Sequence, residues 1–227
     1  MQKLKGELVN ISGGKVLDVC TGNGSFINLL MILLKDFSEI IGIDNIDSGF
    51  PNKKNLLFIK MDANKLAFAN ETFDTVCISN SLHHLPDPNN VLAEMLRALK
   101  PNGTFIINEM FSDNQSEKQL THVYLHHLSG DIDRTLGAFH NKTYKKQEII
   151  DISKNLNLNH LRYFEYHYPQ TEEMTIIDLE NMKEKILAKI NKSPDYIFFE
   201  KKFTEITNRF NSFGFENATQ LFLIGKK

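Results

Sequence analysis

The chain has 227 residues and a formal net charge of −2, and this length is sufficient for one domain with a sizeable core. Because no basic excess is available to neutralise phosphates, a nucleic acid is not expected as a partner. The longest apolar stretch, residues 26–34, is too short to cross a bilayer, so membrane insertion is not expected either. Cys20 and Cys77 both fall in apolar runs, which favours buried free thiols and a cytoplasmic location.

The first half of the chain alternates short β-rich runs with helical stretches. Strands are expected at residues 15–20, 39–44, 55–60, 73–79 and 103–108, and helices at 25–35 and 88–100. Asp87 followed by Pro88 is typical of a helix start, and Pro101-Asn102-Gly103 predicts the end of that helix. Strands that alternate with helices predict a parallel sheet covered on both faces.

The second half of the chain is less regular. Helices are expected at residues 115–129, 145–156, 172–190 and 194–211, and strands at 160–168 and 218–224. Neither a repeat nor a clear linker divides the sequence. We therefore predict a single domain over residues 1–227, with two helical insertions at approximately 111–142 and 169–217.

The strongest functional signal is the sequence Val16-Leu-Asp-Val-Cys-Thr-Gly-Asn-Gly24, in which a strand ends in a glycine loop that opens a helix. Glycine lets a ligand approach the backbone there, and the unpaired N–H groups of the helix face the same crevice. The dinucleotide pattern G-x-G-x-x-G is only half matched, because Ile27 occupies the third glycine position. A nicotinamide-dependent oxidoreductase is therefore the weaker alternative.

Asp18 together with Gly22 and Gly24 resembles motif I of the class I S-adenosylmethionine-dependent methyltransferases, although Cys20 stands where that motif usually has another glycine. Further landmarks follow in the family's order within residues 15–109, at 61–63, 70–76, 79–86 and 99–107. The set most resembles the small-molecule branch that includes ubiquinone- and menaquinone-pathway enzymes. The resemblance implies an α/β fold with a Rossmann-like doubly wound sheet, in the strand order 3-2-1-4-5-7-6 with strand 7 antiparallel, and with the two insertions acting as helical lids.

The resemblance also implies S-adenosylmethionine as the cofactor, S-adenosylhomocysteine as the product and a small molecule as the methyl acceptor. Asp44 would accept hydrogen bonds from the ribose hydroxyls, and Asp62 would take the adenine amino group. The candidate cofactor-binding residues are Asp18, Cys20, Gly22, Gly24, Asp44, Asn45, Asp62, Ala63 and Asn80. A non-catalytic S-adenosylmethionine-binding protein would keep the same residues, so it remains an alternative.

Methyl transfer from a sulfonium requires mainly alignment in a water-poor pocket, with a base if the nucleophile carries a proton. Candidate groups should lie beyond the carboxyl ends of the fourth and fifth strands, where we select His83 and Glu109 as catalytic candidates. In the family, a histidine pair such as His83 and His84 often has a structural role, and that alternative stays open.

A second group of histidines lies in the first insertion. If residues 115–129 are helical, His122 and His126 share one face at i,i+4 spacing. These two residues with His140 are candidates for a divalent metal site, and Glu109 or an aspartate is an alternative third ligand. His126 is also a candidate base in the acceptor pocket, whereas a solvated helix face is the plainer interpretation. The expected apolar stripe of this helix comprises Leu120, Val123, Tyr124, His127 and Leu128.

Overall fold

The computed structural model describes residues 2–50, 53–168 and 173–227. The chain forms two compact units: unit 1 comprises Met1–Glu109, Gln147–Tyr166 and Gln220–Lys227, and unit 2 comprises Met110–Lys146 and His167–Thr219. The two segments of unit 2 enclose the expected insertions at 111–142 and 169–217, of which residues 169–172 lie outside the described part. A single domain in which the insertions act as lids stays a prediction.

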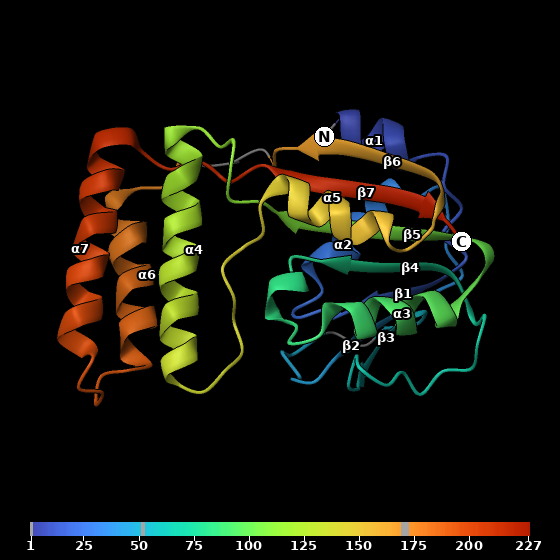
Figure 1. Cartoon of the computed structure of the whole chain (residues 1–227), viewed down its shortest axis with the longest axis horizontal. Helices are drawn as coiled ribbons and strands as arrows, with labels where there is room; N and C mark the ends of the chain where they lie inside the picture. The colour runs from blue at the N-terminus through green and yellow to red at the C-terminus, as the bar shows by residue number, and fades with distance from the viewer. Residues whose placement is uncertain (1, 51–52, 169–172) are drawn as a thin grey trace. The chain divides into compact units, whose positions relative to one another are not determined.

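Unit 1 is built on a seven-stranded sheet in the order β3-β2-β1-β4-β5-β7-β6 (Figure 1). Strands β1 to β5 pair in parallel, and β7 runs antiparallel to β6. This arrangement confirms the predicted strand order and the antiparallel last strand. The strands are β1 Lys15–Val19, β2 Glu39–Asp44, β3 Leu56–Lys60, β4 Phe73–Ser79, β5 Leu99–Met110, β6 Asn159–Tyr166 and β7 Gln220–Lys226.

Helices cover both faces of this sheet, so most side chains of its central strands are buried. In Figure 1, α3 (Pro88–Ala98) and α5 (Lys146–Lys154) lie in front of the sheet, whereas α2 (Ser25–Leu33) lies behind it. Asp87 caps α3 and Pro88 is its first residue, as predicted. A short helix α1 (Gln2–Leu8) precedes the sheet and was not predicted; it buries Leu4 and Leu8.

The predicted end of the helix that follows Pro88 was wrong. Helix α3 ends at Ala98, and residues 99–103, which include the expected turn, are the beginning of β5. Leu99 pairs with Phe73 of β4, and Asn102 and Gly103 exchange backbone hydrogen bonds with Lys227 just beyond β7. These partners are distant in sequence, so local turn signals cannot reveal them.

In the part of unit 2 that the structure describes, α7 (Tyr196–Phe213) packs against α4 (Glu117–Thr135) and α6 (Ile176–Ala188). Capping boxes at Ser116 and Thr175 begin α4 and α6. Helix α4 extends six residues beyond its predicted end at 129, and α7 begins at Tyr196 rather than at Pro194. The predicted start of α6 at residue 172 lies outside the described residues.

The predicted apolar stripe of α4 was also wrong in part. Tyr124 is exposed, whereas Leu125, Leu128 and Ile132 are buried in the core that α4 shares with Phe203 of α7. The buried face of α4 is the one against which α6 and α7 pack. The periodicity of the sequence does not predict on which side of α4 these helices lie. Among the helices that the structure describes, none is long and apolar enough to cross a membrane.

Candidate cofactor site

The loop between β1 and α2 turns sharply through the left-handed region of backbone conformation. Cys20, Gly22 and Gly24 have φ values of 57°, 53° and 80°. Glycine adopts this conformation at little cost, whereas it costs other residues roughly 1–2 kcal/mol. Cys20 is a half-buried free thiol, and its burial, with a contribution from the nearby Asp44, raises its pKa to about 12. Backbone strain of this kind concentrates at binding sites.

The two glycines of this loop have different roles. A Cβ atom added to Gly22 would meet no heavy atom within 4 Å, so its position faces open space. A Cβ added to Gly24 would lie 2.2 Å from Cε2 of Phe50, whose ring is buried against the loop. The sequence predicted that glycine is needed here so that a ligand can approach closely. This reason applies to Gly22, whereas Gly24 is needed to make room for the protein's own Phe50.

Asp44, at the end of β2, points toward the glycine loop. Its Oδ2 atom accepts a hydrogen bond of 2.9 Å from the Gly22 N–H, and its Oδ1 atom accepts one of 3.1 Å from the Ile46 N–H. A carboxylate offers about four acceptor positions, so two remain for donors of a ligand, such as a pair of hydroxyls. The neighbouring Asn45 is exposed.

Asp62 and Ala63 follow β3 at the same edge of the sheet. The Met61 N–H donates to the Asp44 carbonyl at 2.9 Å, which places the start of this loop directly beside the end of β2. Asp62 is exposed, and hydrogen bonds from the backbone and side chain of Asn64 lower its pKa. Asp44 and Asp62 therefore lie at neighbouring strand ends, as their proposed contacts with one nucleoside require.

Asp18 lies beneath the loop rather than on its open side. Its carboxyl group accepts hydrogen bonds from the Thr21 hydroxyl at 2.7 Å and from the Cys77 thiol at 3.3 Å. Burial raises the pKa of Asp18 to about 7, although both hydrogen bonds act in the opposite direction. Both of its oxygens have partners within the protein, so the structure gives Asp18 the task of holding Thr21 and the turn in place.

The buried Asp18 carboxyl group should make stability depend on pH. Its pKa is about 7 in the folded chain and 3.8 in the ordinary reference state, so the folded chain binds more protons between these pH values. The resulting stabilisation is complete below pH 3.8 and is lost as the pH rises through 7. Between about pH 4 and 8, the loss of this contribution should lower the free energy of unfolding of the unchanged chain by a few kcal/mol. In Asp18→Asn, measured by urea unfolding, we expect this pH-dependent contribution to be absent. Parallel pH curves for Asp18→Asn and the unchanged chain would contradict this expectation.

The loop after β4 is tied to the glycine loop. Asn80 has a φ of 47° and donates its backbone N–H to the Asn108 carbonyl at 2.8 Å. The Ser81 hydroxyl lies 2.8 Å from the Ser79 carbonyl and 3.3 Å from the Cys20 carbonyl. The structure thus brings Asn80 beside the turn that contains Cys20.

Glu109, near the end of β5, is the anchor of this second loop. Its Oε1 atom lies 2.5 Å from Nδ1 of His83, and its Oε2 atom accepts hydrogen bonds of 3.1 Å from the N–H groups of Ser81 and Leu82. The side chains of His83 and Glu109 are 1% and 0% exposed. The exposed His84 ring lies with its centroid 4.3 Å from that of His83. The two catalytic candidates are therefore in direct contact, and His83 could reach an acceptor only through Nε2.

The histidines of the first insertion divide into separate groups. His122 accepts a hydrogen bond of 2.9 Å from the Ala218 N–H through Nδ1, and its ring packs against Phe215. Burial lowers the pKa of His122 to about 4. His127 bonds to the Thr143 hydroxyl at 2.8 Å, whereas the Nε2 atoms of His126 and His140 lie 3.3 Å apart. Within unit 2, the structure therefore pairs His126 with His140 and gives His122 a packing role.

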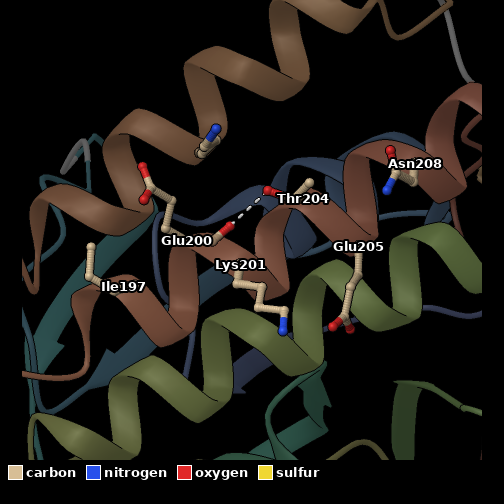
Figure 2. A pocket seen from close by; sticks show the side chains of 7 residues that line it. Ile197, Glu200, Lys201, Thr204, Glu205 and Asn208 are labelled. Atoms are coloured by element: carbon tan, nitrogen blue, oxygen red, sulfur yellow. Dashed lines mark hydrogen bonds between the residues drawn. The ribbon is translucent and has the colours of Figure 1, made fainter.

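A surface groove of about 450 Å³ lies on unit 2 along α7 (Figure 2). The Thr204 hydroxyl in this groove bonds to the backbone carbonyl of Glu200 at 3.2 Å, within the same helix. None of the candidate residues belongs to its lining. The groove is lined by Lys183, Ile197, Glu200, Lys201, Thr204, Glu205 and Asn208.

Known proteins are similar in sequence to the part of unit 1 that contains the loops described above. A sequence model of the methyltransferase domain matches residues 17–107. The chain is 35% identical over 104 residues to a demethylmenaquinone methyltransferase of Renibacterium salmoninarum. This alignment covers 44% of the chain and 42% of that protein. It is 34% identical over 110 residues to a ubiquinone/menaquinone biosynthesis C-methyltransferase of Saccharophagus degradans, with 43% of each covered. Residues 17–107 of this chain are therefore similar to the methyltransferase domain.

The chain is also similar to solved structures. A phosphoethanolamine N-methyltransferase of Haemonchus contortus, in complex with phosphomonomethylethanolamine and S-adenosylhomocysteine, superposes with a TM-score of 0.55 at 15% identity. That superposition covers 96% of this chain and 49% of the other, and at this identity it supports the fold alone. The matches to the curated relatives span less than half of those proteins' lengths.

The span that matches the methyltransferase domain model, residues 17–107, contains every candidate cofactor residue from Asp18 to Asn80, and also His83. Glu109 lies two residues beyond it, and unit 2 lies outside it. Sequence reasoning missed Thr21, Phe50 and Ser81, which shape the two loops. Phe50 had a visible signal, because it is the aromatic residue in the short stretch that follows Asp44.

Proposed function

We propose that the chain is an S-adenosylmethionine-dependent methyltransferase that acts on a small molecule. The observation that carries this proposal is the pairing of Asp44 with the Gly22 N–H, beside the open position at Gly22. This pairing puts an acceptor for hydroxyl groups and an accessible backbone at the carboxyl edge of a parallel sheet, where ligands of such folds bind. The family match covers the same residues.

The donor set fits a nucleoside that carries an amino acid. Asp44 would hold the ribose hydroxyls with its two remaining acceptor positions, Asp62 the adenine amino group, and the turn at Gly22 the amino-acid portion. Ala63, Asn45 and Asn80 would complete the contacts, while Asp18 and Cys20 would support the turn from within. When bound, S-adenosylmethionine supplies an electrophilic methyl group. The chain's own contribution is to align the acceptor and to exclude water.

For His83 and Glu109 we propose a positioning role. Glu109 uses its carboxylate on two backbone N–H groups and on the His83 ring, so both of its oxygens are engaged within the protein. Its effect is to fix the loop that contains Asn80. If the acceptor requires a base, His83 through Nε2 and His126 remain the candidates from the sequence.

The acceptor itself is not carried over from the relatives, because the match ends before unit 2. The net charge of −2 supports a small molecule over a nucleic acid. Two free cysteines support a reducing, cytoplasmic location.

A thermal-shift experiment with S-adenosylhomocysteine and with NAD tests the proposal. Ligand at 100 times its Kd should stabilise the chain by about 2.7 kcal/mol, or roughly 5–10 °C in Tm for this length. We expect this shift with S-adenosylhomocysteine and none with NAD. The reverse result would favour the oxidoreductase alternative, and binding without methyl transfer from labelled donor to any acceptor would favour the non-catalytic one.

A further inference from the structure

His126 and His140 of unit 2 face each other across a distance that suits a shared metal ion. His126 lies on α4 and His140 lies in the segment that follows it, and their Nε2 atoms are 3.3 Å apart. Two imidazole nitrogens at 2.0–2.1 Å from a tetrahedral zinc ion are separated by about 3.3–3.4 Å. We propose that these two nitrogens bind a divalent transition-metal ion.

Asp133 supports this arrangement from behind. Its Oδ2 atom lies 3.0 Å from Nδ1 of His140, and its Oδ1 atom accepts a hydrogen bond of 2.9 Å from Lys189. This contact at Nδ1 orients the His140 ring so that its Nε2 atom faces His126. A carboxylate behind a metal-binding histidine is the usual way in which the ring is oriented.

A glycine in helix α4, Gly130, leaves the space that the His140 ring occupies. A Cβ atom added to Gly130 would lie 3.0 Å from Cδ2 and 3.1 Å from Nε2 of His140. Gly130 is one helical turn after His126, so both residues are on the face that His140 covers. A glycine inside a helix costs about 0.5–1 kcal/mol relative to alanine, and here its absence of a side chain lets the buried His140 lie against the helix.

The ligand type indicates the class of metal. Imidazole nitrogen suits zinc, cobalt, nickel and copper ions, whereas magnesium and calcium prefer oxygen ligands. His122, which the sequence grouped with His126 and His140, is engaged by Ala218 and Phe215 and is not assigned to this site. A direct hydrogen bond between the two rings is the competing explanation of the 3.3 Å distance, and it requires no metal.

Metal binding by the full chain tests the proposal without reference to methyl transfer. After removal of metals with a chelator, Co²⁺ is titrated while its visible absorption is followed, and Zn²⁺ is titrated by calorimetry. We expect one ion per chain and a cobalt spectrum of nitrogen coordination. His126→Ala and His140→Ala should each weaken Zn²⁺ binding at least about 100-fold, and Asp133→Asn about 10–100-fold.

The matched control is His160→Asn, which removes an exposed histidine of unit 1 and keeps a residue that tolerates its φ of 51°. It should bind Zn²⁺ as the unchanged chain does. If the buried His140 cannot be replaced without unfolding, the half-buried His126 carries the test, with circular dichroism as the check on folding. Equal Zn²⁺ affinity in His126→Ala and the unchanged chain, or no binding by either, would overturn the proposal and leave the hydrogen bond between the rings.

Discussion

Asp44→Ala is expected to weaken binding of S-adenosylhomocysteine by about 100-fold or more, measured by isothermal titration calorimetry. The change removes a carboxylate that would accept two hydroxyl hydrogen bonds, each worth roughly 1.5–3 kcal/mol when one partner is charged. It also releases the Gly22 N–H, which Asp44 holds at 2.9 Å, so the turn that faces the ligand loses a support.

Asp47→Asn is the matched control, because Asp47 lies in the same loop and its carboxylate accepts a hydrogen bond from Gly49 rather than from the glycine turn. It should leave the affinity within about twofold. Asp44→Asn keeps one oxygen for the Gly22 N–H but loses the charge, and we expect an intermediate loss. An Asp44→Ala protein that folds and binds S-adenosylhomocysteine as tightly as the unchanged chain would remove the basis of the proposed function.

Glu109→Ala is expected to lower the free energy of unfolding by roughly 3–5 kcal/mol, measured by urea denaturation. The substitution deprives the buried His83 ring and the N–H groups of Ser81 and Leu82 of their common acceptor. It also leaves a cavity in a fully buried position. Glu109→Gln keeps one oxygen for the two N–H groups and should lose less.

Glu39→Gln serves as the control for Glu109. Glu39 forms a surface ion pair of 3.0 Å with Lys15 at the opposite end of the parallel strands, and its loss should cost at most about 1 kcal/mol. If Glu109→Ala unfolded at the same urea concentration as Glu39→Gln, the loop after β4 would not depend on the Glu109 carboxylate, and the positioning role would have to be abandoned.

The sequence by itself determined the parallel part of the sheet and the residues at its carboxyl edge. The buried run at residues 40–43 pairs only in the interior, and it is followed directly by the polar Asp44. The side of the sheet on which these residues meet follows from the βαβ pattern alone. The glycine loop and the cap at Asp87 were visible for the same reason, because each depends on residues close together in the chain.

Tertiary structure decided the features that depend on partners distant in sequence. The strand at residues 99–103 forms because Phe73 and Lys227 arrive beside it, and the buried face of α4 is set by α7. The thiol of Cys77 donates to the buried Asp18 carboxyl group, and Gly24 is required by Phe50. The pairing of His126 with His140, rather than with His122, likewise depends on how the chain returns after α4. Local periodicity does not predict from which side a distant segment packs, because that contact is fixed only when the partner segment is in place.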